Sequence, residues 1–209
     1  MLAERDALLG AIGHDLRTPI TSLRLRAERI EDAVLREKMI GTLRETEGML
    51  EDVLALARTG APAEAAAPAD LAALLREAAE EAVAAGRRLT LGPASPVVAP
   101  VHRELLKRAL QNLIDNADRY AGGGTIGLAR EGGQAVFTIA DEGPGIPPGP
   151  ADRLLEPFAR GEASRSRRTG GAGLGLAIAA RAAQLHGGTL SLRNKETGGL
   201  EARLSLPLS

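Results

Sequence analysis

The chain has 209 residues, a formal net charge of -1 at pH 7, and hydrophobic and charged fractions of 44% and 25%, as in an ordinary globular protein. So small a net charge gives no overall attraction to nucleic acid or anionic lipid, so any anion must be bound by a local site. The absence of cysteine excludes disulfides and thiolate metal sites, and no apolar run reaches the ~20 residues needed to span a bilayer. The first residues also lack the order of a secretory signal.

The first 58 residues predict two long helices. Apolar residues recur at spacings of three, four and seven over 9–30 and again over 35–57, with Ile12 and Leu16 facing inward. Such narrow stripes pair helices in bundles, and the charged residues between them allow a short connection, so we expect an antiparallel hairpin. Because two helices alone bury little apolar area, a hairpin of this length usually completes a four-helix bundle by dimerising. We therefore expect residues 1–60 to form a homodimer.

A second domain is predicted over 70–209, after a Pro/Ala-rich linker at 61–69 and an aspartate placed as a helix N-cap, Asp70. The pattern predicts helices at 71–85, 101–120 and 174–185, and strands at 88–91, 96–99, 125–129, 134–140, 189–193 and 200–206. Strand pairs beside helices, without regular βαβ alternation, indicate an α+β fold in which this domain is an α/β sandwich.

The segment from His14 to Pro19 carries the first candidate chemistry, because the predicted apolar stripe leaves His14 pointing outward at mid-helix. A neutral imidazole is a competent nucleophile, and the adjacent Asp15 can hold one ring nitrogen protonated, which leaves the other free to attack. Thr18 lies one turn away, near enough to position a water. Pro19 inside a helix costs about 3 kcal/mol, which is hard to justify structurally. An exposed histidine beside an ordinary kink is the alternative.

A polar helical face is the second candidate. Asn112 and Asn116 are four residues apart, and Arg119 and Tyr120 follow three and four residues after Asn116, so all four share one face. Carboxamide oxygens suit Mg²⁺, which keeps waters and shares its coordination with phosphates. A solvated polar face explains the pattern equally well.

Two glycine-containing segments complete the candidate site. Asp141 ends a predicted strand, and Gly143 and Gly145 let the backbone after it pass close to a planar ligand, although a plain turn explains this segment nearly as well. The glycines over 170–175 lead into an apolar helix, whose start is a phosphate site. This glycine pattern does not follow a strand and lacks Gly-Lys-Ser/Thr, which disfavours a dinucleotide-binding fold and a P-loop. The basic run 165–168 before it is either a solvated loop or a cover for an anionic ligand.

In this order, the segments resemble motifs of the histidine kinase family: an H-box around His14, an N-box at 112–120, a G1 box at 141–145 and a G2 box at 171–175. The residues 156–160 resemble its F-box, and 187–190 its last glycine turn. Each motif is weak alone, but six in one order are specific. The resemblance spans almost the whole chain and implies a dimerisation and phosphotransfer hairpin, followed by an ATP-binding sandwich of the Bergerat type.

The resemblance also implies a role for each matched residue. His14 would be the phosphoacceptor, Asp15 its polarising partner or base, and Thr18 the residue that positions water during dephosphorylation of the partner. Asn116 would bind Mg²⁺ with Asn112 beside it, and Arg160 would reach the γ-phosphate. Asp141 would accept a hydrogen bond from the adenine amine, and Phe158 would anchor a lid over 147–171. The implied nucleotide-binding set comprises Asn112, Asn116, Arg119, Tyr120, Asp141, Gly143, Gly145, Ile146, Phe158, Gly171, Gly173, Leu174 and Gly175.

The implied protein is an ATP-dependent protein-histidine kinase that uses ATP and Mg²⁺. It would pass the phosphoryl group from His14 to an aspartate of a response regulator receiver domain and could also dephosphorylate that partner. We expect a homodimer without nucleic-acid partners. We also expect a cytoplasmic location, as the portion of a membrane-anchored sensor whose sensor region is not present in this chain.

Two other function classes are weighed against this one. Other Bergerat ATPases, of the gyrase, chaperone or mismatch-repair type, share the asparagine, Asp-x-Gly and glycine-loop features but would not carry the His14 motif on a preceding hairpin. A dimeric scaffold or degenerate kinase would bind ATP without turnover. Every expected catalytic side chain is present, so nothing in the sequence supports degeneration.

Overall fold

The computed structural model describes residues 2–57, 65–159 and 173–208, and it divides into two compact units, Met1–Ala61 and Pro62–Ser209. The division falls at the start of the stretch that the sequence predicts as a linker. Within the described residues, no helix combines the length and the apolarity needed to cross a membrane.

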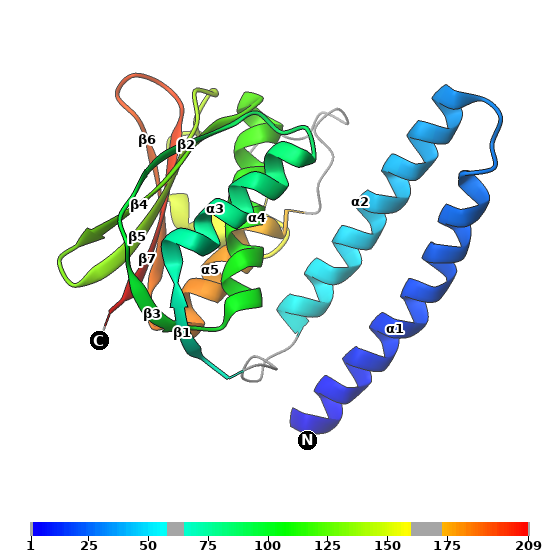
Figure 1. Ribbon diagram of the computed structural model, residues 1–209, viewed down its shortest axis with the longest axis horizontal. Coiled ribbons are helices and arrows are strands. Elements are labelled where there is room, and N and C mark those ends of the chain that lie inside the picture. The colour runs from blue at the N-terminus through cyan, green and yellow to red at the C-terminus, as the bar shows by residue number, and fades with distance from the viewer. Residues whose placement is uncertain (1, 58–64, 160–172, 209) are drawn as a thin grey trace. The chain divides into compact units, whose positions relative to one another are not determined.

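The first unit is an antiparallel pair of helices, α1 (Leu2–Ala27) and α2 (Ala33–Ala57) (Figure 1). Asp32 starts the second helix, since its Oδ1 accepts hydrogen bonds from two backbone amides of the first turn of α2, at 2.9 and 3.0 Å. Farther from this connection, the Arg17 guanidinium of α1 lies 3.6 Å from the Glu51 carboxylate of α2. The predicted hairpin is therefore present, with its connection where the charged residues indicate it.

Many apolar side chains of this hairpin are exposed in the single chain. Ala27 and Leu54 are buried, but Ile12 and Leu16, which the sequence places inward, are 41% and 44% exposed. The other exposed apolar side chains of the pair are Leu23, Leu25, Val34, Leu35, Met39, Met49 and Val53. Ile12 and Leu16, which the sequence predicts to face inward, therefore do not lie in a core formed by the hairpin alone. An apolar surface of this kind is what the remaining helices of a four-helix bundle would cover.

The second unit is a two-layer sandwich in which helices cover one face of a five-stranded sheet of order β2-β4-β5-β7-β6 (Figure 1). The sheet consists of β2 (Leu89–Ala94), β4 (Gly124–Glu131), β5 (Gln134–Ala140), β6 (Thr189–Asn194) and β7 (Leu200–Pro207), and the helices are α3 (Leu71–Ala84), α4 (Arg103–Ala121) and α5 (Gly175–Leu185). A short 3₁₀ helix, η1 (Ala151–Leu155), precedes α5. The α+β class predicted from the sequence is confirmed.

The core of this unit lies between the helices and the sheet. Along β7 the buried residues alternate with half-buried ones, as expected for a strand with one face on the core. Phe137 of β5 is fully buried at the centre of a cluster that is otherwise built from leucine, isoleucine, valine and alanine. On α4 the buried residues are those of one helical face: Leu106, Ala109, Leu110, Leu113, Ile114 and Ala117. The opposite polar face of α4 is thereby left for other contacts.

The strand pairing differs in part from the sequence-based expectation. The β4–β5 and β6–β7 hairpins form as predicted, and β5 pairs antiparallel with β7. However, β2 pairs parallel with β4, so one crossover connection is present. In addition, β1 (Ala67–Asp70) begins within the linker predicted at 61–69 and pairs antiparallel with β3 (Val98–Val101), so that Pro68 is opposite Pro100. Proline is tolerated in such a short ladder at the edge of a fold.

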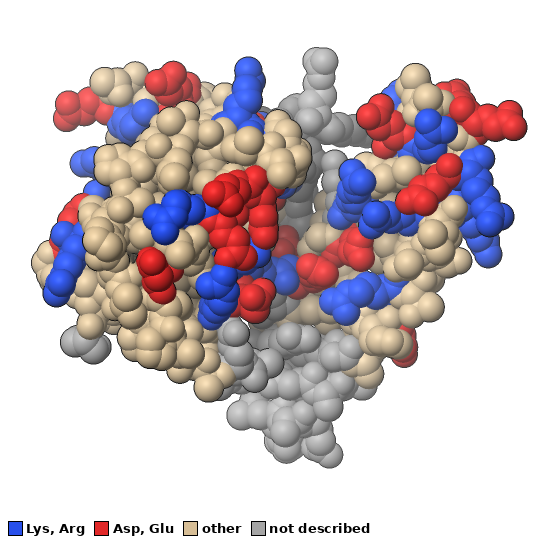
Figure 2. Space-filling view, viewed as in Figure 1, with Lys and Arg blue, Asp and Glu red and all other residues tan. Residues whose placement is uncertain are grey.

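Two sets of polar contacts hold α4 in place. On the side of α3, the Lys107 ammonium donates to Glu77 at 2.8 Å and to Glu81 at 2.6 Å, and Arg103 pairs with Glu77. Figure 2 shows acidic and basic side chains intermixed on the face of this unit that is turned to the viewer. The hydrogen bond from Lys107 lowers the pKa of the Glu77 carboxyl, and it raises the pKa of Lys107 itself.

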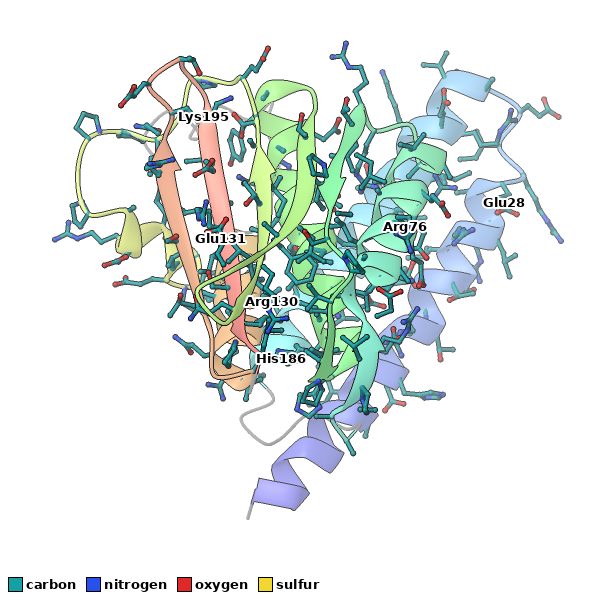
Figure 3. The ribbon with its side chains drawn as sticks, turned by 60° about the vertical axis from the view of Figure 1, so that its left-hand side comes forward. Glu28, Arg76, Arg130, Glu131, His186 and Lys195 are labelled. Atoms are coloured by element: carbon teal, nitrogen blue, oxygen red, sulfur yellow. The ribbon has the colours of Figure 1, made fainter. Side chains whose placement is uncertain are left out.

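The second set joins the start of α4 to the end of α5. The backbone N–H of His102 donates to Nε2 of His186 at 2.9 Å, and Nδ1 of His186 lies 2.7 Å from the carbonyl oxygen of Ala182. Since Nε2 accepts, Nδ1 is the ring nitrogen that carries the proton and donates. Helices α4 and α5 are therefore tied together at the end of the sheet that lies opposite Lys195 (Figure 3).

We predict that Glu77→Gln lowers the urea midpoint of unfolding at pH 7, because it removes the carboxylate that pairs with Lys107. A carboxyl whose pKa is lowered by folding stabilises the fold above its ordinary value of 4.5, and this contribution is lost as the pH falls through the lower folded value. The difference from the wild type should therefore narrow below pH 4.5. Glu80→Gln, on the same helix and exposed, is the control and should change the midpoint little. An equal difference at every pH would contradict the prediction.

Candidate active site

His14 lies on the surface of α1, where its side chain is 81% exposed. Its Nδ1 lies 3.3 Å from Oδ1 of the neighbouring Asp15, whose carboxylate is equally exposed. An imidazole that directs its Nδ1–H at a carboxylate keeps Nε2 unprotonated and free to attack an electrophile. The structure thus brings together the two residues that the sequence proposes as nucleophile and polarising partner.

The helical turn after His14 contains the third residue of the predicted motif. The Thr18 hydroxyl donates to the His14 carbonyl oxygen at 3.3 Å, so Thr18 lies directly beside the backbone of the histidine. Pro19 follows inside α1, which continues to Ala27. Because proline has no N–H, it cannot donate to the carbonyl of Asp15 four residues earlier. The backbone hydrogen bonding of α1 is therefore altered next to the candidate nucleophile.

Sequence reasoning missed Gly13, which lies immediately before the histidine and against α2. A Cβ at position 13 would be 2.5 Å from Cδ1 of Leu54, and Leu54 is buried. Glycine inside a helix costs about 1 kcal/mol relative to alanine, so its presence calls for a packing reason, and the close approach of Leu54 is that reason. An isolated glycine within a strong helical pattern was the signal that could have found it.

On the second unit, the two asparagines lie on the polar face of α4, and Asn112 lies beside the start of α5. Asn112 donates through Nδ2 to the Arg108 carbonyl at 3.1 Å, and a Cβ on Gly175 would lie 3.0 Å from its Oδ1. Asn116 is half-buried, and its carboxamide has no hydrogen-bond partner among the residues that the structure describes. An unpaired carboxamide on the same face as Asn112 can serve as a ligand group.

The C-terminal end of α4 meets the segment that follows β5. A Cβ on Gly143 would lie 3.0 Å from the Ala121 Cβ and 3.2 Å from the Tyr120 carbonyl oxygen, so only glycine fits comfortably there. The side chains of Arg119 and Tyr120 are exposed, and Arg119 forms no ion pair within the described part of the chain. Helix α4 is thus bordered by both glycine-containing segments that the sequence singles out.

Asp141 is a buried carboxylate, 5% exposed, and no other charged side chain in the described ranges is buried. Its Oδ1 accepts hydrogen bonds from the backbone N–H of Gly143 at 2.8 Å and of Leu200 at 3.0 Å. Its Oδ2 has no hydrogen-bond partner among the described residues. A buried acceptor oxygen that the protein leaves unpaired suits a donor on a ligand, such as an exocyclic amine.

Those of the remaining predicted residues that the structure describes lie around the start of α5. The backbone N–H of Phe158 donates to the Gly173 carbonyl at 3.0 Å, with Phe158 at a φ of 65° and its side chain 68% exposed. Leu174 is buried, so it can offer only its backbone to a ligand, and Gly175 begins the helix. Arg160 and Gly171, predicted to meet the γ-phosphate and the phosphate tail, lie outside the described residues.

These groups fit a magnesium nucleotide. The free oxygen of Asp141 suits an amine, the N-terminal end of α5 suits phosphate, and the carboxamide oxygens of Asn112 and Asn116 are of the kind that binds Mg²⁺. The asparagines belong to α4 itself, and the other two groups belong to segments that contact α4 or its C-terminal end. Asn194, which no sequence pattern singles out, also contacts this region, because its carboxamide pairs with the backbone of Ile146.

Two family models match the chain. The model described as "Histidine kinase-, DNA gyrase B-, and HSP90-like ATPase" matches residues 101–209, and the model described as "His Kinase A (phospho-acceptor) domain" matches residues 4–62. The first therefore covers the α4, β4–β7 and α5 elements, and the second covers the α1–α2 hairpin with His14.

Individual relatives agree with these matches. The sensor histidine kinase GtrS of Pseudomonas aeruginosa is 40% identical over 206 residues, which are 99% of this chain and 42% of GtrS. The sensor protein RstB of Escherichia coli is 32% identical over 218 residues, which are 100% of this chain and 50% of RstB. The chain thus spans about half the length of the curated relatives it matches.

Solved structures resemble the chain as well. Full-length ShkA, crystallised in complex with AMPPNP, superposes with a TM-score of 0.71 at 27% identity, over 97% of this chain and 46% of ShkA. The histidine kinase domain of the E. coli osmosensor EnvZ, solved by NMR, has a TM-score of 0.55 at 34% identity, over 72% of this chain and 93% of that domain.

Proposed function

Because the chain belongs to the histidine kinase family, we propose that it phosphorylates His14 from ATP and transfers the phosphoryl group to an aspartate of a response regulator receiver domain. The observation that carries this proposal is the pairing of His14 Nδ1 with Asp15, which leaves Nε2 as an exposed nucleophile. The gathering of Asn112, Asn116 and Asp141 around α4 supports the nucleotide half of the reaction.

The proposed step is a phosphoryl transfer in which atoms and charges balance. The lone pair of His14 Nε2 forms a bond to the γ-phosphorus of ATP while the bond from that phosphorus to the bridging oxygen breaks, which releases ADP. The imidazole thereby gains positive charge, and the Asp15 carboxylate beside Nδ1 stabilises it or takes its proton. In the second reaction the phosphoryl group passes from Nε2 to a carboxylate of the receiver domain, and His14 is regenerated.

The nucleotide would be held by the groups that border α4. Asp141 Oδ2 would accept from the adenine amine with Gly145 against the ring, and the start of α5 from Gly173 to Gly175 would meet the phosphates. Mg²⁺ would neutralise phosphate charge, and the carboxamide oxygens of Asn116 and Asn112 would hold it. Arg119, Arg160 and Gly171 are assigned to the phosphates, and Tyr120, Gly143, Ile146 and Phe158 to the nucleotide, on the family resemblance.

The hairpin supports the proposal of a homodimer. The exposed apolar residues of α1 and α2, such as Ile12 and Leu16, would form the core of a four-helix bundle with the same helices of a second copy. The exposed His14 would then be accessible to a receiver domain. We place this reaction in the cytoplasm, where ATP and receiver domains meet, and leave any membrane attachment to sequence outside these 209 residues.

The match to the phosphoacceptor domain separates this proposal from its nearest rival. The ATPase family model also covers gyrase-like and HSP90-like proteins, which hydrolyse ATP without a phosphohistidine. The second model matches the hairpin that carries His14, and this hairpin is the feature that such ATPases would not carry. A label from γ-labelled ATP that is acid-labile and base-stable would identify phosphohistidine.

A second activity, dephosphorylation of the partner, is proposed for Thr18. Its hydroxyl lies beside the His14 backbone on the next turn of α1. From this position the hydroxyl can hold a water near the phosphoryl group of a docked receiver domain, and it cannot itself be the attacking atom of the kinase reaction.

We predict that His14→Gln abolishes self-phosphorylation and leaves the affinity for ATP nearly unchanged, because the acceptor and the nucleotide groups belong to different units. The measurements are incorporation of label from γ-labelled ATP and a nucleotide titration on the same preparation. Label that persists on another residue would show that His14 is not the acceptor.

For Asn116→Ala we expect loss of Mg²⁺-dependent ATP binding and of kinase activity while the fold survives, because Asn116 lies on the polar face of α4 and not in the core. Gln111→Ala is the matched control, since this carboxamide on the same helix hydrogen-bonds to Glu81 on α3. Binding with and without Mg²⁺ is compared for both variants. Labelling at the wild-type level in Asn116→Ala would mean that the metal site is elsewhere.

Thr18→Ala should separate the two activities. Dephosphorylation of the receiver domain should fall by on the order of 10²-fold or more, the usual worth of a group that positions a reactant, and self-phosphorylation should change much less. Both rates are measured on one preparation. An equal loss of both would indicate that Thr18 only supports the helix around Pro19.

A further inference from the structure

The turn between β6 and β7 holds the segment 141–146 at both ends. We propose that Asn194, the last residue of β6, is a positioning residue for nucleotide binding that acts through the backbone of Ile146. This inference rests on the proposed function, because segment 141–146 contains Asp141 and Gly145, which are assigned to the adenine. Figure 3 shows Lys195, the next residue, on the turn between β6 and β7.

The contact at Ile146 is bidentate. The backbone N–H of Ile146 donates to Asn194 Oδ1 at 2.8 Å, and Asn194 Nδ2 donates to the Ile146 carbonyl oxygen at 2.8 Å. One carboxamide therefore satisfies both backbone groups of a single residue, in the manner of a strand partner. Such a pair fixes the peptide planes on both sides of Ile146, which a single hydrogen bond would not do.

The contact at the other end of the segment comes from the residues that close the same turn. Asp141 donates its backbone N–H to the Leu200 carbonyl at 2.9 Å, and Leu200 donates its own N–H to Asp141 Oδ1 at 3.0 Å. A Cβ on Gly199 would lie 2.0 Å from the Asp141 carbonyl oxygen, so the two backbones touch. Segment 141–146 is thus attached to the β6–β7 turn before and after its two glycines.

Gly145 shows that the Asn194 contact is built into this segment. It has a φ of 72°, and a Cβ at this position would lie 2.4 Å from Asn194 Oδ1. Any larger residue would push the carboxamide away from Ile146. The glycine that the sequence assigns to close approach of a ligand therefore also gives Asn194 room to reach the backbone.

Asn194 is suited to positioning and contributes little to the core. It is exposed, and it ends β6, an edge strand of the sheet. The hydrophobic core of the unit does not include it, and its side chain makes both of its hydrogen bonds, among the described residues, to Ile146. Loss of its carboxamide should therefore loosen segment 141–146 while the global fold remains. The nucleotide would then have to order the segment as it binds, which weakens binding.

The test compares Asn194→Ala with Thr197→Ala, a neutral and exposed position in the same turn. We expect the alanine variant at 194 to raise the Kd and the KM for ATP roughly ten-fold, as for one to two lost hydrogen bonds, with kcat at saturating ATP nearly unchanged. The amide of Ile146 should exchange its hydrogen faster, and the Tm should shift little. Thr197→Ala should match the wild type in all five measurements. If Asn194→Ala does not fold, Asn194→Asp replaces it, since it keeps the shape, while its second oxygen cannot donate to the Ile146 carbonyl and adds a negative charge.

Unchanged Kd and KM in the variant, or a loss in kcat alone, would overturn the positioning role. So would an equal effect of Thr197→Ala. Failure of the proposed function gives a different result: the wild type itself would neither bind ATP nor become labelled on His14, and the inference on Asn194 would fall with it. A wild type that binds and is labelled, beside an Asn194→Ala variant that binds equally well, would remove the inference on Asn194 alone.

Discussion

The buried carboxylate of Asp141 imposes a constraint on much of the nucleotide-binding unit. An ionised carboxylate out of contact with water is strongly unfavourable unless hydrogen-bond donors surround it. Here the backbone N–H groups of Gly143 and Leu200 donate hydrogen bonds to one carboxylate oxygen of Asp141. For these donors to reach that oxygen, the chain has to turn at Gly143, and the β6–β7 hairpin has to place Leu200 beside Asp141. The second oxygen has no hydrogen-bond partner among the described residues, and we propose that it accepts from a ligand. The same constraint thus accounts for the glycine at 143, for the contact between β5 and the β6–β7 turn, and for a site that can discriminate between donors.

The two units solve the problem of burial in different ways. The sandwich has a closed core around Phe137, and its helices and sheet cover each other. Among the side chains of the hairpin whose burial is described, few apolar ones are buried, so these gain little from the hydrophobic effect in a single copy. A second copy can supply the missing contacts without any change to the sandwich. This division explains how one chain can combine an exposed histidine, the proposed nucleophile, with a candidate nucleotide site that depends on burial.

Local patterns in the sequence predicted the parts of this structure that are determined locally. The β4–β5 hairpin forms around Gly132 and Gly133 because both have positive φ, as a two-residue turn requires. Helix α4 was predicted from its apolar face and the glycines after it. In contrast, β1 and the parallel pairing of β2 with β4 depend on which distant segments meet, and a Pro/Ala-rich stretch gives no sign of a strand. The same limit applies to Asn194, which lies 48 residues from the Ile146 that it holds.

The exposure of His14 has a further consequence for how transfer can proceed. A side chain that is 81% exposed is surrounded by water, which would compete with it for a reactive phosphoryl group. The hairpin offers no cover of its own, because Asp15 beside the histidine is just as exposed. In the proposed transfer to His14, exclusion of water would therefore have to come from outside the hairpin. Leu54 packs against Gly13, immediately before the histidine, and this contact would help to keep the proposed nucleophile in place during transfer.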